Sequence, residues 1–122
     1  MKSHKDLDVW KRSMDMVVNI YRLTRQFPSD EQYGLSSQIR RSAISIPSNI
    51  AEGSARSSDK EFKQFLYIAL GSAAEVETQL ILTEKLGYLN SVNDFLVEIS
   101  DIRKMLTGLI SYVNKRKTIG KG

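Results

Sequence analysis

The sequence predicts an all-α protein, an antiparallel up-and-down four-helix bundle. Apolar residues recur with a period of about 3.6 in four segments, and helix-capping residues mark several of their ends. No segment shows the alternation of apolar and polar residues that is typical of a strand. With 122 residues, 41% of them apolar and 26% charged, the composition fits one soluble domain. We expect this domain to span residues 1–116 and a disordered basic tail to follow over residues 117–122.

The first predicted helix runs from about residue 6 to residue 26 and stops before Pro28. One apolar stripe on it consists of Leu7, Trp10, Met14, Val17 and Tyr21, and a second consists of Val9, Met16, Ile20, Leu23 and Phe27. Together they cover an arc of about 200°, twice the roughly 100° that a surface helix needs. Because one bundle is expected to cover only half of that arc, we predict an oligomer interface formed by Val9, Met16, Ile20 and Leu23. Ile20→Asp is then expected to weaken assembly before it unfolds the chain.

The second predicted helix begins at a capping box, in which Ser29 is followed three residues later by Gln32, and continues to about Glu52. Gly53 is predicted to be its C-cap. Pro47 lies within the pattern, where it removes one backbone hydrogen bond, so we expect a kink in the helix at that point.

The third predicted helix starts at Ser58 and Glu61, which have capping-box spacing, and ends at Gly87. Halfway along it, the small residues of segment 71–74 are predicted to let a neighbouring helix approach closely. The fourth predicted helix runs from about Val92 to Lys115.

The residues for most enzymatic chemistry are missing. The chain has no cysteine, and its one histidine is His4, near the N-terminus. A thiolate metal site, a Glu-x-x-His di-iron site and a Ser-His-Asp triad are therefore excluded. The acidic residues in predicted helices are interpreted as salt-bridge partners or solvated side chains, with a metal pair as the alternative: Glu52, Glu75, Glu77 and Glu84. We predict a protein that is not an enzyme, with no catalytic residue, no cofactor and no metal.

Charge is unevenly distributed along the chain. The formal net charge is +4, but residues 1–51 carry +3, residues 52–102 carry −5 and residues 103–122 carry +6. The basic residues that can contact nucleic-acid phosphates are Lys11, Arg12, Arg22, Arg40, Arg41, Lys115, Arg116 and Lys117. We expect no exposed aromatic residues among them, so binding would be directed at phosphates and sensitive to salt.

Arg40 and Arg41 have two interpretations. Adjacent helical residues point about 100° apart, so one of the two is expected to border the core. That arginine either forms an ion pair with Glu52 or Glu75 or contacts a phosphate.

The chain is expected to be cytoplasmic. Charged residues stand where a signal peptide needs an apolar core. The uncharged stretch over residues 65–74 is shorter than the roughly 20 residues of a membrane span, so no membrane partner is expected.

Several stretches resemble one family. They are Asp6-Leu-Asp-Val-Trp-Lys11, the segment from Gln38 to Gly53 and the segment from Phe65 to Ser72, and they resemble the 23S rRNA intervening-sequence family of four-helix-bundle proteins. Its members are encoded in insertions within bacterial 23S rRNA genes or stand alone, and the family has no established enzymatic activity. A similar branch, the accessory proteins of diversity-generating retroelements, forms a basic pentameric barrel that engages a reverse transcriptase and nucleic acid. The resemblance implies a bundle kinked at Pro47 and a ring-shaped homo-oligomer of five subunits.

Two functions remain open at this point. The protein binds structured RNA or DNA through a basic surface, or it is a protein-interaction scaffold whose partners are its own subunits and another protein. Phosphate binding weakens steeply as salt rises, whereas apolar docking does not, so salt dependence separates the two.

Overall fold

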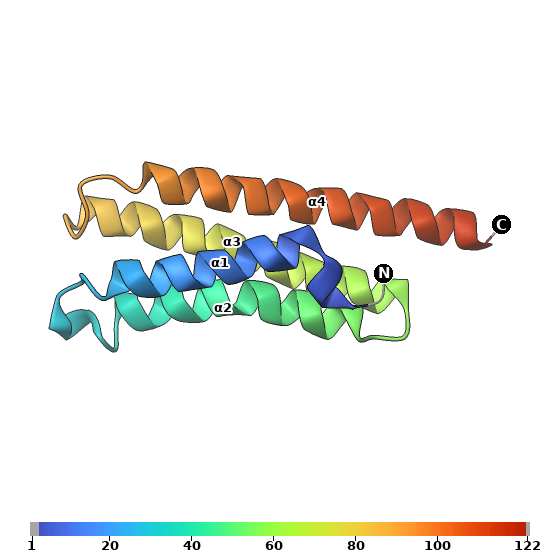
Figure 1. Ribbon diagram of the computed structural model, residues 1–122, viewed down its shortest axis with the longest axis horizontal. Coiled ribbons are helices and arrows are strands. Elements are labelled where there is room, and N and C mark those ends of the chain that lie inside the picture. Colours follow the sequence, from blue (N-terminus) through green and yellow to red (C-terminus); the bar gives the residue numbers. More distant parts are fainter. Residues whose placement is uncertain (1–2, 122) are drawn as a thin grey trace.

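The computed structural model consists of long antiparallel helices joined by short connections (Figure 1). It describes the backbone of residues 3–121 and the side chains of residues 3–116. The helices are α1 (Asp8–Thr24), α2 (Leu35–Ser54), α3 (Asp59–Lys85) and α4 (Asn93–Lys121), with short 3-10 turns η1 (His4–Asp6) and η2 (Ser29–Glu31). No strand occurs among the described residues. The predicted four-helix bundle is confirmed.

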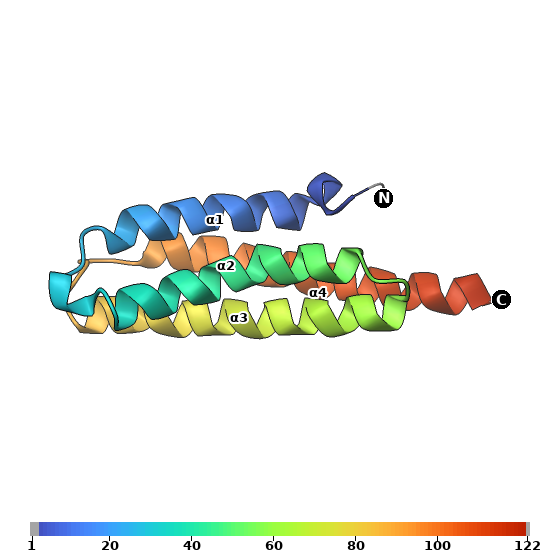
Figure 2. The same ribbon diagram turned by 90° about the horizontal axis from the view of Figure 1, so that it is seen from below.

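The helices lie at the corners of a square. Neighbours along the chain pack together, most extensively α2 with α3, and α4 closes the square against α1. The backbones of α1 and α3 do not approach each other, and Figure 2 shows these two helices on opposite sides of the bundle.

The helix starts follow local chemistry. As predicted, Ser58 caps α3, where its side-chain oxygen accepts a hydrogen bond from the Glu61 backbone N–H at 3.2 Å. The second helix begins at Leu35, later than predicted, because Gly34 has non-helical backbone angles (φ −106°, ψ −117°). Ser29 therefore opens the separate turn η2, and the predicted single helix from Ser29 is wrong.

The middle and end of α2 differ from expectation in one respect. The helix continues through Pro47 to Ser54, and the kink at Pro47 stays a prediction. Gly53 lies inside the helix and is not its C-cap. A Cβ at this position would lie 2.7 Å from the Phe65 Cβ and 3.0 Å from Phe62 Cδ1. Only glycine fits at this position without a clash, because α2 and α3 approach each other so closely.

The small residues of α3 do not all serve helix contact. Gly71 is exposed and has no atom within 4 Å of the position a Cβ would take. The contact with α2 is made one residue later, where Ser72 Oγ donates to Ser45 Oγ at 2.8 Å. By length and composition, α3 is the described helix that could cross a membrane, and only a third of its apolar stretch is buried here. The core helix of a soluble bundle meets the same criteria.

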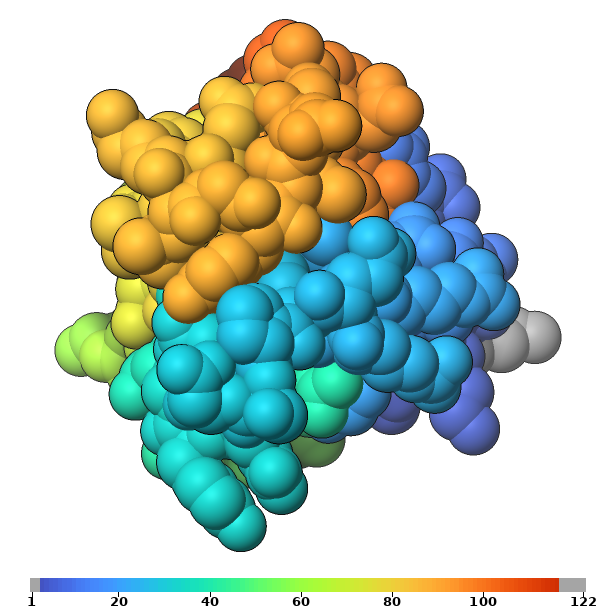
Figure 3. Space-filling model, turned by 90° about the vertical axis from the view of Figure 1, so that its left-hand side faces the viewer, coloured from blue at the N-terminus to red at the C-terminus, as the bar shows by residue number. Residues whose placement is uncertain are grey.

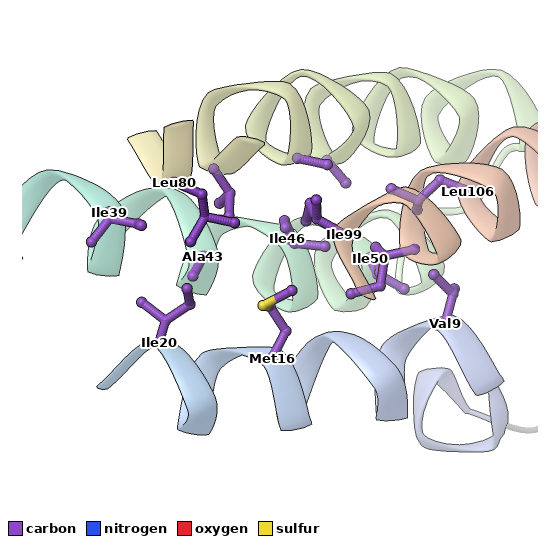
Figure 4. Packing of buried hydrophobic residues seen from close by; sticks show 14 of the residues in the cluster. Val9, Met16, Ile20, Ile39, Ala43, Ile46, Ile50, Leu80, Ile99 and Leu106 are labelled. Carbon is purple, nitrogen blue, oxygen red and sulfur yellow. The ribbon is translucent and has the colours of Figure 1, made fainter. Parts of the chain in front are cut away.

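The predicted oligomer-interface residues are part of the core. Val9, Met16, Ile20 and Leu23 are each at most 4% exposed and belong to the core cluster. Figure 4 shows Val9, Met16 and Ile20 directed from α1 into the bundle, toward residues such as Ile46 and Ile99. The prediction that they form a surface for another subunit is wrong. The bundle covers one of the two apolar stripes of α1, as expected, but it is this stripe, because α2 and α4 pack against the side of α1 that carries it.

The other apolar stripe of α1 is the one left partly uncovered. Met14 is 43% exposed, while Trp10 and Val17 are half-buried against α2. Val18, beside this stripe, is 48% exposed.

A hydrogen bond ties together the two connections at one end of the bundle. The Tyr88 hydroxyl donates to Glu31 Oε2 at 2.5 Å, and the Leu35 backbone N–H donates to Glu31 Oε1 at 3.0 Å. Figure 3 shows this end, with the α1–α2 connection in cyan beside the α3–α4 connection in orange. The bond from Tyr88 and, second, that from Leu35 lower the pKa of Glu31, and the same bond raises the pKa of Tyr88.

Removal of this bond should change how stability depends on pH. Because folding lowers the pKa of Glu31, the carboxylate stabilises the fold above its unfolded pKa and loses that effect as pH falls through its folded pKa. Tyr88→Phe is therefore expected to melt at a lower temperature than the unchanged protein at neutral pH. The difference should shrink as pH is lowered from about 7 to about 3. Thermal melts followed by circular dichroism measure both, and a difference that persists at low pH would contradict the assignment.

Candidate nucleic-acid interface

Ion pairing divides the arginines into two groups. Four of them lie within 3.3 Å of a carboxylate oxygen, in the pairs Arg12–Asp101, Arg56–Glu52, Arg103–Glu77 and Arg116–Asp59. The other four form no ion pair with any described residue; they are Arg22, Arg25, Arg40 and Arg41. All four lie where α1 ends and α2 begins, on the left of Figure 1. We call this region the arginine end.

Arg40 is held in place at the arginine end. Its Nε donates a hydrogen bond to Thr24 Oγ1 at 2.7 Å, and its guanidinium carbon lies 4.5 Å from the centre of the Tyr21 ring. The Thr24 hydroxyl itself donates to the Ile20 carbonyl at 2.9 Å, which fixes its direction. The two terminal nitrogens of Arg40 have no hydrogen-bond partner among the described residues. An oriented guanidinium with its outer edge free can bind an oxyanion with two hydrogen bonds.

The predicted ion-pair alternative for this arginine is not observed. Arg40 borders the core, as expected of one of the two adjacent arginines, but its contacts are a hydroxyl and an aromatic ring. Glu52 pairs instead with Arg56, one turn along the chain. Arg41 is exposed and forms no ion pair with a described residue.

The other predicted phosphate-binding residues are scattered. Arg12 and Arg116 are engaged in ion pairs, and the hydrogen bond from Arg116 to Asp59 raises the pKa of Arg116. Lys11 and Lys115 are exposed but lie far along α1 and α4 from the arginine end (Figure 1). The side chain of Lys117 lies outside the described residues. Of the predicted set, Arg22, Arg40 and Arg41 therefore lie at the arginine end.

Sequence reasoning missed two residues at this end. Arg25 follows α1 directly and lies three residues after Arg22, a spacing that places both on neighbouring parts of one helix surface. Tyr33 lies between η2 and α2 and is 89% exposed. The expectation of no exposed aromatic residue among the basic residues is wrong here. The predicted second helix began at Ser29 and so included Tyr33, whereas the observed helix begins after it. The Tyr33-Gly34 pair before the apolar period was the available signal for a turn.

Arg22 is less free than its neighbours. It lines a cleft of about 330 Å³ between α1 and α4, together with Asp94 and Glu98. No oxygen of either carboxylate is within ion-pair distance of it, but their negative charge lowers the local potential. Arg25, Arg40 and Arg41 are therefore the stronger anion-binding candidates.

The acidic residues are used structurally. Glu52 and Glu77 form the ion pairs described above, and Glu84 Oε1 accepts a hydrogen bond from the Val92 backbone N–H at 3.2 Å. Glu75 is exposed. Over the described residues, no group of three or more histidine, aspartate or glutamate side chains is arranged to hold a metal ion.

Comparison with known proteins identifies a family and solved structures with a similar fold. Residues 5–108 match the family model of the 23S rRNA-intervening sequence protein. Among solved structures, the chain is similar to a protein of unknown function from the S23 ribosomal protein family of Bacteroides thetaiotaomicron. That similarity has a TM-score of 0.74 and 29% identity, and it covers 84% of this chain and 97% of the other. A search of curated proteins found no match.

Proposed function

Because the chain belongs to the family of 23S rRNA-intervening sequence proteins, we propose that it is a cytoplasmic, non-enzymatic protein that binds structured RNA or DNA through the arginine end. The family name refers to 23S rRNA, and that of the structural neighbour refers to a ribosomal protein. Both names support RNA as the first nucleic acid to test.

The main support for nucleic-acid binding is the way the Arg40 side chain is held. Most protein contacts to nucleic acid go to phosphate oxygens, and arginine suits them because its planar fork matches their geometry. Thr24 and Tyr21 already hold the Arg40 side chain, so binding a phosphate costs less side-chain entropy than it would for a free arginine. Arg25 and Arg41 add positive charge at the same end, and neither forms an ion pair with a described residue.

Tyr33 extends what this end can recognise. An exposed ring at the same end of the bundle as unpaired arginines can stack on an unpaired base, and such stacking contributes about 1–3 kcal/mol per base. Unpaired bases occur in the loops and bulges of structured RNA, whereas they are paired and stacked in a continuous duplex. An RNA hairpin with an open loop is therefore the appropriate first ligand.

Loss of the Arg40 side chain is expected to weaken RNA binding at every salt concentration tested. Arg40→Ala should reduce the slope of log affinity against log salt by about 1, because one phosphate contact is removed. Fluorescence anisotropy with a labelled RNA hairpin, over a series of salt concentrations, measures both affinity and slope.

Arg56→Ala is the matched control for this experiment. It removes the same charge at the other end of α2, where Arg56 is already paired with Glu52 and lies over the Phe65 ring. Its salt slope should stay close to that of the unchanged protein. Equal effects of the two substitutions would show that only net charge matters, and would contradict binding at the arginine end.

Self-association is the second part of the proposal. We take the number of subunits, five, from the accessory proteins of diversity-generating retroelements that the sequence resembles. A ring would repeat the arginine end once per subunit, so that weak binding at each copy adds up on a long polyanion. Light scattering at micromolar concentration tests it, and a mass near 13.9 kDa, that of one chain, would contradict it.

The alternative function is a protein-interaction scaffold with no nucleic-acid role. The exposed apolar side chains on α3, among them Tyr67 and Ile68, favour it. RNA binding that is absent even at low salt, with self-association intact, would support the scaffold.

A further inference from the structure

Two apolar surfaces of the described chain stay uncovered by its own side chains. The first, which we call the α3 ridge, is the outer face of α3 and consists of Tyr67, Ile68, Gly71, Ile81 and Leu82. The second, which we call the α1–α2 groove, is a hollow of about 350 Å³ between these helices. Its apolar lining consists of Trp10, Met14, Val17, Ile44, Pro47 and Ala51. Since α1 and α3 lie on opposite sides of the bundle (Figure 2), the two surfaces are separate.

The α3 ridge has the character of a contact surface. Its four large apolar side chains are between 41% and 57% exposed, where the outer face of a soluble helix normally carries charged residues. Gly71 lies in the middle of this face, with open space around the position of its missing Cβ. Glycine within a helix costs about 1 kcal/mol relative to alanine, and nothing inside the bundle requires it here. A missing side chain does let the backbone of another helix approach closely.

The α1–α2 groove has the opposite shape. Met14 and Ile44, which are 43% and 39% exposed, lie on its two sides, and Pro47 and Ala51 line it from α2. The groove is concave and the ridge is convex, so the two can interlock as ridges and grooves of packed helices do.

We propose that the α3 ridge of one copy packs into the α1–α2 groove of the next copy. This rests on the self-association proposed above and names the two surfaces that make it. Pairing two ridges, or two grooves, would leave the second surface of each copy exposed. Ridge-to-groove contact covers both surfaces in every subunit once the chain of contacts closes into a ring.

Charge supports the same pairing. Glu75 is exposed on the outer face of α3, one turn after Gly71, and Lys11 is exposed on α1, three residues before Met14. Neither forms an ion pair with a described residue, and their signs are opposite. The carboxylate of Glu75 also makes lipid a poor occupant of the ridge, because a charged group is costly in the apolar part of a bilayer.

The arginine end does not line the groove. The lining of the groove ends at Val17 and Ile44, and Tyr21 and Arg40 lie one helical turn beyond them. Arg40 is therefore not among the residues that the proposed contact uses.

A mixing experiment tests the pairing. Gly71→Glu places a long charged side chain on the ridge and improves helix propensity, so it should not unfold the monomer. Met14→Glu places a charge at the groove on an already exposed position. By light scattering, each variant alone is expected to have the mass of one chain. An equimolar mixture should form dimers, because each pair of variants retains one intact ridge and one intact groove.

The control is Val97→Glu, which changes an apolar side chain that is 62% exposed on α4, outside both surfaces, and should leave the oligomer unchanged. If the unchanged protein assembles but Gly71→Glu or Met14→Glu keeps its full mass, the surfaces are wrongly assigned. If both are monomers and the mixture stays monomeric, ridge and groove do not bind each other. If the unchanged protein is itself a monomer, the proposed self-association fails as well.

Discussion

Ile20→Asp is expected to unfold the isolated chain, and not merely to weaken its assembly. The Ile20 side chain is fully buried between α1 and the rest of the bundle (Figure 4). Loss of a buried aliphatic side chain of this size costs about 2–5 kcal/mol, and an unpaired carboxylate in the core adds several more. The total approaches the whole stability of a typical domain, about 5–15 kcal/mol.

Val18→Asp is the matched control on the same helix. Val18 is 48% exposed, so an aspartate there remains in water and gives up little apolar contact. Circular dichroism at low protein concentration, where self-association is minimal, should show helix loss for Ile20→Asp and a folded chain for Val18→Asp. A folded, monomeric Ile20→Asp variant would mean that Ile20 belongs to a subunit interface after all.

Gly53→Ala is expected to destabilise the fold by about 2 kcal/mol, within the range for an overpacked core. Its Cβ would lie 2.7 Å from the Phe65 Cβ, and no side-chain rotation can relieve a clash between two Cβ atoms. Helices α2 and α3 would have to separate along their most extensive contact. This cost outweighs the roughly 1 kcal/mol that alanine gains over glycine in helix propensity.

Gly108→Ala isolates the propensity effect. Gly108 is exposed within α4, with nothing within 4 Å of the position of a Cβ, so this change should stabilise the chain by about 0.5–1 kcal/mol. Urea titrations of the two variants should therefore shift in opposite directions. A Gly53→Ala variant more stable than the unchanged protein would show that α2 and α3 are not in such close contact.

The candidate site was only partly readable from the sequence. Arg40 and Arg41 were singled out because they are adjacent, but the free edge of Arg40 depends on Thr24 and Tyr21, which are at least sixteen residues away in the chain. The sequence also did not indicate which arginines form ion pairs. Arg12 pairs with Asp101 and Arg116 with Asp59 across different helices, and no local pattern indicates such pairs.

The sequence by itself determined the all-helical class, the four helices and most of their ends. These features depend on local causes: the period of the apolar residues, the Ser58 cap and the positive φ of Gly87, which few residues other than glycine adopt. Only the tertiary structure decided which of the two apolar stripes of α1 is buried. A helical period shows that a face is apolar, but it does not show which of two apolar faces the neighbouring helices cover. Because α2 and α4 pack against the side of α1 that carries Ile20, that stripe became core and the stripe with Met14 was left partly exposed.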